Sequence, residues 1–569
     1  MNQNFERMVK YMRRHKKLVA LMLVVAMLIM ASLSGCGSKN ATGVNGEYVM
    51  DDVLNPLGSD VICKEKVTLE FMMGNNGAVS DYDSNKYTLE LERKGNVDIQ
   101  FNLVPGSDLQ TKVNLVLSSG KDLPDVINTT LDSATIATYG SAGLFVPLNN
   151  YYANSSEYLA PQIETLKQDI GLNIYDYITM SDGNIYGIVK YNESLQNEIP
   201  HLLWINKAWL AKAGMEVPKT IDEFVAALKY FKTHDMNGNG KSDEIAMVDY
   251  TKGGLLELIE NAYVKTGVDS ITIKDDGTLD MAYATDGYKE YLKFMNKLYS
   301  EGLLDTTTFS QDKTTFQTLL NAETTIVGVF AATSTSMLSA GSARRENHEY
   351  APMFVDNTSK PGYNTFRYMQ TMPEQGMFIT TACEHPEVAF RIADYMCSEE
   401  MTVWSRWGEK GTDWLEPTSS TVGMYEFMGY PAYLEPVLPW GPTQNSHWQN
   451  GTPGFRRTNV SLGMSSNDAS QVSKSYAINE LYNRYGKDFV NDVKDQRVYK
   501  LVYSETELSE MSDITAAINP YVTQMRYEFI TGKQSIDSGW DSYIKELKGL
   551  NIDRLVEINN TAYNRMKNK

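Results

Sequence analysis

Short strand-like runs alternate with amphipathic helices along most of this 569-residue chain, and that order limits the folds open to it. Between residues 67 and 128 the order is two strands, a helix and a third strand, at 67–73, 97–104, 109–119 and 125–128. The apolar residues of the helical stretch recur at near-helical spacing, and Gly120 is a candidate for its end. A strand, helix, strand order predicts an open α/β sheet whose ligands bind beyond the carboxyl ends of the strands.

Farther along, apolar stripes at helical spacing predict more helices packed on a core. A short apolar run at 202–206 precedes a helix whose start is marked by Thr220 and Glu223, which have the spacing of a capping box. Apolar residues at 224, 227, 228 and 231 give that helix one buried face. Similar helices are predicted at 288–300, 386–398, 540–549 and 552–566.

The first 35 residues differ in charge and hydropathy from the rest of the chain. They contain six basic residues and one acidic residue, and an uninterrupted apolar run occupies 18–31. As a helix this run would be about 21 Å long, which is shorter than the ~30 Å hydrocarbon core of a bilayer. A basic stretch, an apolar run of this length and the small residues after it predict a signal peptide at 1–35. A buried helix or a short membrane anchor is the alternative.

The end of this segment, Leu33-Ser34-Gly35-Cys36, resembles the lipobox of bacterial lipoproteins. The resemblance implies that the signal peptide is cut before Cys36, that Cys36 is lipidated, and that the mature protein is anchored at the extracellular face of the cell membrane. The polar sequence that follows has no sustained period, so a flexible tether is predicted within 36–66.

The three other cysteines predict no disulfide framework. Cys383 and Cys397 flank the helix predicted at 386–398, whose length separates them by more than the ~7 Å that a disulfide spans. The sequence contains no CxxC pair and no Cys/His cluster, so zinc and dithiol chemistry are not predicted either.

The acidic balance of the chain argues against two classes of partner. The formal net charge is −19, and it becomes −24 once residues 1–35 are removed. Such a charge repels phosphate backbones and anionic lipid surfaces, so no nucleic-acid role is predicted. The sequence also contains no HExxH, GxSxG or Walker A pattern and no dinucleotide-binding fingerprint, so no enzyme is predicted.

Residues 235–244 have the spacing of a loop that binds a hard cation. Side chains with oxygen stand at loop positions 1, 3, 5 and 9, a glycine stands at position 6, and position 7 offers its carbonyl, as in calcium loops. The loop departs from an EF-hand at position 12, where Ala246 replaces the bidentate glutamate, while Glu244 stands at position 10. The alternative is a turn rich in Gly and Asn that closes the preceding helix.

Tryptophans are concentrated in one stretch of the chain. Five of the eight lie between residues 404 and 448, partly in non-helical sequence rich in Pro and Gly. Tyr and Trp rings stack on the C–H faces of sugars and suit a cleft that must bind and release its ligand. Core packing is the alternative for each single ring. With two asparagines at predicted strand ends, the candidate substrate-binding residues are Asn75, Asn128, Trp204, Trp407, Trp440 and Trp448.

Several segments in fixed order resemble one family. They read LVLSSGKDLPDV from residue 115, GLFVPL from 143, DGNIYG from 182, LWINKAWL from 203 and FITG from 529, with a similar ending at 540–565. The chain resembles the extracellular solute-binding proteins, family 1, of ABC importers, in particular the LipO-like lipoproteins, from residue 33 to the C-terminus. This resemblance implies the type II periplasmic-binding-protein fold, in which two discontinuous α/β lobes joined by a hinge close on a ligand in the cleft between them.

On that fold the N-terminal lobe would comprise 67–190 plus about 376–440, and the C-terminal lobe about 191–375 plus 441–569. The chain would cross between the lobes near 188–202, near 376–382 and a third time within 400–445. Each lobe is therefore expected to be built from segments that are distant in the sequence.

The resemblance also implies a function. It predicts a lipid-anchored, monomeric substrate-binding protein that presents an oligosaccharide to the permease subunits of an ABC importer. Alginate-binding members of the family carry a calcium loop of the same pattern, which implies a structural Ca²⁺ here with the ligands Asp235, Asn237, Asn239, Lys241 (through its carbonyl), Asp243 and Glu244. A peptide or other solute is the second candidate ligand, and a surface carbohydrate-active enzyme is the alternative class.

Overall fold

The structure is a computed structural model that describes residues 48–251, 253–437, 442–449, 453–465, 469–486, 489 and 497–567. All the elements below belong to one compact unit, Val53–Lys569. The predicted signal peptide and the predicted lipidation site at Cys36 lie outside the described residues. In the part of the chain that is described, no helix combines the length and the apolar character needed to cross a membrane.

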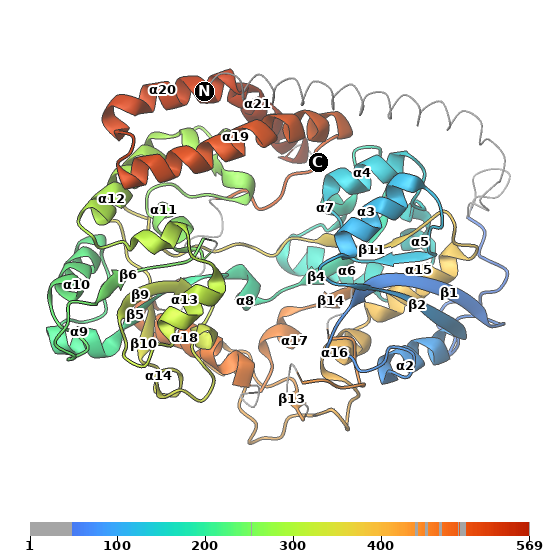
Figure 1. The fold of residues 1–569 in the computed structure, drawn as a ribbon. Helices are drawn as coiled ribbons and strands as arrows, with labels where there is room; N and C mark the ends of the chain where they lie inside the picture. The colour runs from blue at the N-terminus through green and yellow to red at the C-terminus, as the bar shows by residue number, and fades with distance from the viewer. Residues whose placement is uncertain are drawn as a thin grey trace. The chain divides into compact units, whose positions relative to one another are not determined.

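The first sheet has six strands and mixed direction (Figure 1). Both neighbours of its strand β1 run parallel to it, whereas β11 is antiparallel to the strands on either side. The order across the sheet is β14 (Gly454–Arg456), β4 (Gly187–Asn192), β11 (Glu374–Ile379), β3 (Val126–Asn128), β1 (Val67–Asn75) and β2 (Val97–Pro105).

Helices from two distant parts of the sequence pack on this sheet. The helix predicted at 109–119 is confirmed as α3, and Gly120 ends it in the left-handed conformation at φ 61°. One core cluster joins α3 to the sheet through Val113, Ile127 and Phe378. The helices of this region are α2 (Lys86–Gly95), α3 (Leu109–Ser119), α4 (Ser133–Ser141), α5 (Asn149–Asn154), α6 (Leu159–Ile170), α7 (Tyr175–Ile178), α15 (Pro386–Met396) and α16 (Glu399–Trp407).

The second sheet has four strands and is covered on both faces. Every residue of β5, β9 and β10 is buried, as expected for strands between two layers. The order is β10 (Tyr350–Met353), β5 (Leu202–Asn206), β9 (Val327–Ala332) and β6 (Ile245–Met247). The helix α8 (Leu195–Glu198) precedes β5, and the helices between the strands of this sheet are α9 (Lys207–Ala213), α10 (Ile221–Thr233), α11 (Leu255–Glu260), α12 (Asp286–Ser300), α13 (Lys313–Leu320) and α14 (Ala343–Glu346).

The start of α10 confirms the predicted capping box. The Thr220 side chain accepts a hydrogen bond from the main chain of Glu223, and the Glu223 carboxylate accepts one from the main chain of Thr220. Its predicted apolar face is buried among the residues that cover the second sheet. The helix therefore begins where local hydrogen bonding and the apolar stripe both place it.

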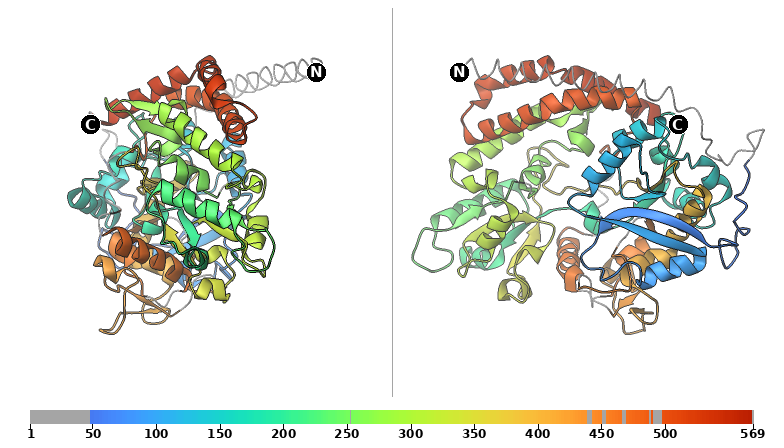
Figure 2. Two further views of the ribbon diagram at one scale, coloured as in Figure 1. Left: turned by 90° about the vertical axis from the view of Figure 1, so that its left-hand side faces the viewer. Right: turned by 45° about the vertical axis from the view of Figure 1, so that its right-hand side comes forward.

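The last three helices pack together as a layer (Figure 2). The long helix α19 contacts α12, α20, α21 and also α4, so it touches elements of both sheet regions. These helices are α19 (Glu505–Thr531), α20 (Ile536–Gly549) and α21 (Ile552–Lys567), preceded by α17 (Thr458–Leu462) and α18 (Ala469–Tyr485). The remaining described strands form two small sheets of two strands each. In one, β7 (Ile271–Ile273) pairs with β8 (Leu279–Met281); in the other, β12 (Trp414–Leu415) pairs with β13 (Glu435–Pro436).

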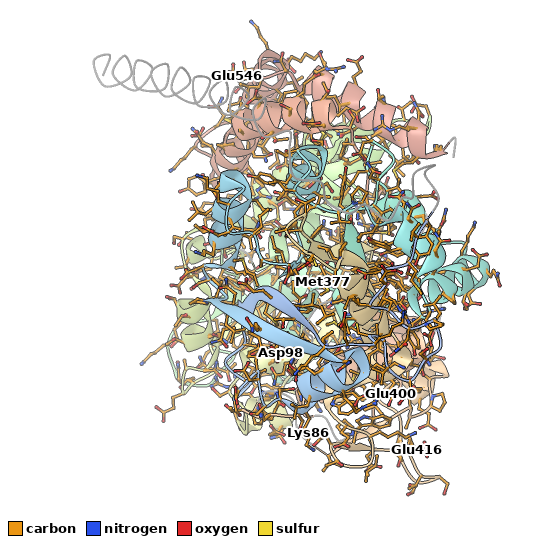
Figure 3. All side chains as sticks on the ribbon, turned by 90° about the vertical axis from the view of Figure 1, so that its right-hand side faces the viewer. Lys86, Asp98, Met377, Glu400, Glu416 and Glu546 are labelled. Atoms are coloured by element: carbon orange, nitrogen blue, oxygen red, sulfur yellow. The ribbon has the colours of Figure 1, made fainter. Side chains whose placement is uncertain are left out.

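Apolar side chains form the core of the structure, and acidic side chains lie mainly at its surface. Met377 in β11 is fully buried, whereas Glu400, Glu416 and Glu546 are exposed (Figure 3). None of the described cysteines forms a disulfide, as predicted. The acidic surplus is thus carried largely by solvated side chains.

Two connections run directly from a strand of one sheet to a strand of the other, one from β4 to β5 and one from β10 to β11. The first lies within the crossing predicted at 188–202. The second occupies 354–373, just before the predicted range. The strand β14 pairs with β4 in the first sheet, although its residues fall in the range that was predicted for the C-terminal lobe. The sequence did not indicate this strand, because its three residues contain no apolar run. The lobe boundaries stay a prediction.

Candidate functional site

Each of the two sheets has one edge at which the connections to the other sheet leave and arrive. In the first sheet β1, β2, β3, β4 and β14 all end at the same edge, where β11 begins. In the second sheet β6, β9 and β10 end at the edge where β5 begins. Both connections run from one of these edges to the other. Ligands of open α/β sheets bind outside the carboxyl ends of strands, so these two edges form the candidate site.

The two predicted asparagines lie on the first edge. Asn75 is the exposed last residue of β1, and Asn128 is the buried last residue of β3. Because Met73 is the partner of Asn128 in the parallel pairing, the two asparagines end neighbouring strands. The Asn128 amide nitrogen lies 3.9 Å from the Met73 sulfur. The structure thus brings these residues together at the sheet edge; their contact with a ligand stays a prediction.

A row of charged groups on the same edge was not predicted. The Lys190 ammonium lies 3.5 Å from both the Thr130 hydroxyl and the Glu374 carboxylate. At the adjoining position Arg456 donates from Nε to the Asn192 amide oxygen at 2.6 Å. Only the position of these residues in the sequence could have indicated this charged row: Lys190 and Asn192 stand at the start of the predicted crossing between the lobes.

The first connection is anchored beside this row. One oxygen of Glu193 accepts hydrogen bonds from the main-chain N–H and the hydroxyl of Thr458, at 2.6 and 2.7 Å. Arg457 donates to the same carboxylate at 3.2 Å and to Asp169 at 2.9 Å. Charge-assisted bonds of this kind fix the direction in which the chain leaves β4.

The second edge carries a buried carboxylate at the end of β6. Asp249 is 2% exposed, and its Oδ2 accepts a hydrogen bond from the Leu255 N–H at 2.8 Å. Among the residues that the structure describes, its Oδ1 has no hydrogen-bond partner. A Cβ on Gly253 would lie 1.7 Å from that oxygen, so glycine is required for the loop to close over the carboxylate. Burial, the largest cause, raises the pKa of Asp249 to about 7.

This pKa gives a testable pH dependence. Folding raises the pKa of Asp249 above its ordinary value of about 4, so the folded state binds the proton more tightly. The stability that the protonated carboxyl contributes is fully present below about pH 4 and is lost as the pH rises to about 7. Relative to Asp249→Asn, we expect the wild-type protein to lose about 1.4 kcal/mol per pH unit across that window.

Urea unfolding of both proteins between pH 5 and 9 measures this difference. Asp541→Asn, at an exposed position, serves as the control and is expected to track the wild type at every pH. A constant difference between wild type and Asp249→Asn from pH 5 to 7 would contradict the prediction.

Three of the four predicted tryptophans lie in packed clusters. Trp204 and Trp407 are 0% and 2% exposed among the aromatic residues beside the second sheet. Trp448 is 1% exposed, lies 5.0 to 6.0 Å from three aromatic ring centroids, and donates from Nε1 to the Thr88 hydroxyl. Trp440 lies outside the described residues. This burial is what the core-packing alternative predicts, and the proposed contact of these rings with a ligand stays a prediction.

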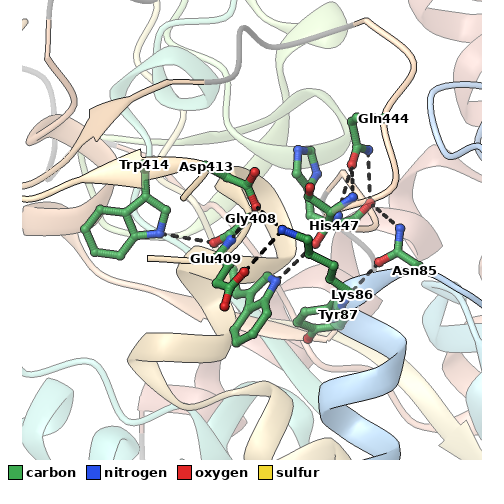
Figure 4. A network of polar contacts seen from close by, with 11 residues as sticks. Asn85, Lys86, Tyr87, Gly408, Glu409, Asp413, Trp414, Gln444 and His447 are labelled. Carbon is green, nitrogen blue, oxygen red and sulfur yellow. Dashed lines mark hydrogen bonds and ion pairs between the residues drawn. The ribbon is translucent and has the colours of Figure 1, made fainter. Parts of the chain in front are cut away.

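The tryptophan-rich stretch is tied to the start of α2 (Figure 4). Lys86 lies 3.2 Å from Glu409, and the Asn85 amide donates to the His447 carbonyl at 3.3 Å. The indole of Trp414 donates to the Gly408 carbonyl within the same network. Segments more than 300 residues apart in the sequence are thereby fixed against one another.

The side-chain oxygens of the predicted calcium loop accept hydrogen bonds from the main chain of the loop itself. Asp235 accepts hydrogen bonds from the N–H groups of Gly238 and Gly240 at 2.7 and 2.8 Å, and both glycines have positive φ. Asn237 and Asn239 each accept a bond from the main chain two residues on. The main-chain hydrogen bonds to Asp235, that from Gly240 above all, lower the pKa of Asp235, so its carboxylate is held in the charged form.

The end of the loop completes the oxygen set. The amide nitrogens of Asn237 and Asn239 each donate to Asp243 at 2.9 Å, and the buried Glu244 accepts from the Met236 N–H at 2.7 Å. Rotation of the two amides would replace their N–H donors by oxygens facing Asp243, so the donor set fits a hard cation. Among the described residues no three His, Cys, Asp or Glu side chains are grouped as metal ligands.

Comparison with known proteins identifies the family. The sequence profile of the bacterial extracellular solute-binding proteins matches residues 82–403, which is more than half of the chain. The chain belongs to this family. The fructooligosaccharide ABC transporter substrate-binding protein FusA of Streptococcus pneumoniae serotype 4 is 25% identical over 552 residues, 94% of this chain and 96% of FusA. Lipoprotein LipO of Bacillus subtilis is 28% identical over 42% of this chain and 45% of LipO.

Solved structures confirm the predicted fold class of this solute-binding protein. An HMO-binding, ABC-transporter-associated solute-binding protein from Bifidobacterium longum infantis superposes with a TM-score of 0.72 at 20% identity, covering 88% of this chain and 98% of the other. FusA in complex with kestose gives a TM-score of 0.69 at 22% identity over 88% of this chain and 100% of FusA. An EF-hand mutant of FusA in complex with fructo-nystose gives 0.68.

Proposed function

We propose that this solute-binding protein binds an oligosaccharide between its two sheet edges and presents it to the permease subunits of an ABC importer. The observation that carries the proposal is the pairing of those edges through both connections, together with a match to FusA over nearly the whole of each chain. The two edges belong to different sheets: Lys190 lies on the first, and the buried Asp249 holds the loop that follows β6 at the second. A ligand that touches both would favour the closed form, and the permease would recognise that form.

The protein is proposed to act as a monomer anchored at the extracellular face of the cell membrane. The anchor would be lipid on Cys36, joined to the folded unit by the tether within 36–66. Mass spectrometry of the protein purified from its membrane tests this: the expected N-terminus is a lipidated Cys36. An unmodified N-terminus upstream of residue 36 would contradict it.

Calorimetric titration with a panel of ligands tests the function. The panel contains kestose, nystose, milk oligosaccharides, oligogalacturonates and short peptides. We expect saturable binding of one oligosaccharide class and a smaller radius of gyration in X-ray scattering when that ligand is present. Binding of peptides alone would favour the second candidate ligand, and release of shorter sugars from a polysaccharide would favour the enzyme alternative.

Calcium is proposed as a structural ion in the 235–244 loop. The loop would bind it through Asp235, Asn237, Asn239, Lys241 (carbonyl), Asp243 and Glu244, and the bound ion would fix the loop between α10 and β6. The oxygen-bearing side chains that this loop gathers support the proposal, as does the existence of an EF-hand in FusA.

We expect calcium at one hundred times its dissociation constant to stabilise the protein by about 2.7 kcal/mol, because only the folded loop gathers the oxygens. In Asp243→Asn, which keeps the shape of the side chain and removes its charge, calcium should bind at least about tenfold more weakly. Melting temperatures with calcium and with chelator measure both effects, and Asp541→Asn is the control. Equal melting temperatures with calcium and chelator in the wild type would refute the calcium assignment.

A further inference from the structure

The loop 76–85 links the first ligand edge to α2. It begins directly after Asn75, the exposed last residue of β1, and it ends where α2 begins. Its residues Gly77 and Ser80 are exposed, whereas Val79 and Tyr82 are buried. The shape of this loop therefore determines how the end of β1 and the exposed loop residues are presented at the edge.

Tyr82 supports the loop 76–85 from inside. Tyr82 is 4% exposed, and its ring centroid lies 5.3 Å from that of Phe101 and 6.0 Å from that of Trp448. Its hydroxyl oxygen accepts a hydrogen bond from the Asn76 N–H at 3.1 Å. Because the two neighbouring rings hold the phenol in place, its hydroxyl is a fixed acceptor at the first residue after Asn75.

Gln444, from the tryptophan-rich stretch, supports the same loop from the side (Figure 4). Its main-chain N–H donates to the Ala78 carbonyl, and its carbonyl accepts from the Ser80 N–H, each at 2.9 Å. Its side-chain amide donates to the Ala78 and His447 carbonyls, at 3.2 and 3.0 Å. The amide oxygen accepts from the N–H groups of Ser446 and His447, at 2.6 and 3.0 Å. These four bonds use both N–H groups and both lone pairs of the amide, so its orientation is fixed.

Asn445 extends this contact to the end of the loop. Its Oδ1 accepts from the Asp81 N–H at 3.2 Å, and its Nδ2 donates to the Ser84 hydroxyl at 3.1 Å. Its carbonyl accepts from the Lys86 N–H at 3.0 Å. The loop is thus held along its length by residues 361 and 364 positions later in the sequence. Such support orders the loop before a ligand arrives, so ordering it adds no cost to binding.

We propose that Tyr82 and Gln444 are positioning residues for the ligand: they hold the loop 76–85 in the form that binds an oligosaccharide, and they act through the loop and Asn75. This inference rests on the proposed function. It gives Trp448 an indirect role, because the indole packs against the Tyr82 ring. A preformed loop binds more tightly than one that must be ordered during binding, so a loosened loop should weaken affinity while the protein stays folded.

The variant Tyr82→Phe removes the hydroxyl and keeps the ring. Kestose, nystose and milk oligosaccharides are the probes, and the probe that the wild type binds saturably in calorimetry is used for every variant. The lost hydrogen bond should weaken binding about three- to tenfold. Tyr543→Phe is the matched control, because Tyr543 is 1% exposed and its hydroxyl donates to the Tyr283 carbonyl in the layer of the last three helices. Both variants should lower the melting temperature by similar amounts, and the control should bind like the wild type.

The variant Gln444→Glu keeps the size of the side chain and replaces its N–H donors by a carboxylate oxygen. That oxygen would face the two main-chain carbonyls that now accept from the amide, so binding should weaken at least about tenfold. Gln162→Glu is the matched control. Gln162 is also half-buried and donates to two main-chain carbonyls, those of Tyr158 and Cys397, but it lies in α6 and not beside the loop. This control should also bind the probe like the wild type.

Hydrogen exchange of the main-chain amides, measured by mass spectrometry without ligand, gives a second readout. Exchange within 76–80 should be about tenfold faster in Tyr82→Phe and Gln444→Glu and unchanged in both controls. The proposal is overturned if either variant exchanges there at the wild-type rate or binds the probe as tightly as its control. A wild type that binds no probe would instead refute the proposed function, and this inference with it.

Discussion

A Gly267→Ala variant is expected to lose about 3 kcal/mol or more of its free energy of unfolding. A Cβ at this position would lie 1.9 Å from the Val498 carbonyl oxygen and 2.8 Å from its main-chain carbon and nitrogen. The neighbouring N–H of Val268 donates to the same carbonyl at 2.7 Å. The methyl group must therefore displace main chain and break a buried hydrogen bond, which costs more than the usual ~1–3 kcal/mol of an overpacked core.

Urea unfolding of the Gly267→Ala variant and of the wild type measures this loss. Gly549→Ala is the control: no heavy atom lies within 4 Å of its Cβ, and alanine in a helix should be neutral or slightly stabilising. Equal stability of the two variants would contradict the expected clash.

Trp204→Ala is expected to cost about 3–5 kcal/mol. The side chain is 0% exposed in β5 and belongs to the cluster that contains Phe330 and Tyr350. Its indole N–H donates to the Ala332 carbonyl at 3.0 Å. Truncation removes the ring, leaves a cavity and leaves that carbonyl without its donor.

Trp204→Phe separates packing from ligand contact. It retains a ring and should cost about 1–2 kcal/mol, mainly through the lost donor to Ala332. Oligosaccharide affinity of this variant tests the predicted ligand contact of Trp204: a folded protein with weakened affinity would support that contact, and unchanged affinity would assign the ring to the core. A stability loss below 1 kcal/mol in Trp204→Ala would contradict the packing described here.

The longer elements of the fold could be predicted because local sequence and tertiary packing agree. The helix at 109–119 has both an apolar face and a glycine at its end, and α10 has a capping box before its stripe. Strands of two or three residues carry no such period. Gly454–Arg456 is a strand only because β4 offers a parallel partner, which lies more than 260 residues earlier.

The candidate site was predictable where topology alone determines a position. Asn75 and Asn128 end parallel strands, so an α/β fold places them at one edge. Lys190 with Glu374, and Asn192 with Arg456, are joined across 184 and 264 residues, and no spacing rule links residues at that separation. The role of the tryptophans could not be predicted from the sequence. An indole ring that can stack on a sugar can also fill a core, and composition does not distinguish these two roles.

The connections between the sheets have a consequence for limited proteolysis. The chain passes from the first sheet to the second after β4, returns before β11, and leaves again after β14 to reach α18, which packs on β10. A protease that cuts any one of these passages leaves the two sheets joined by the others. Release of a separate half would need several cuts, so a nicked protein should migrate as fragments in denaturing gels while eluting as one particle in native buffer.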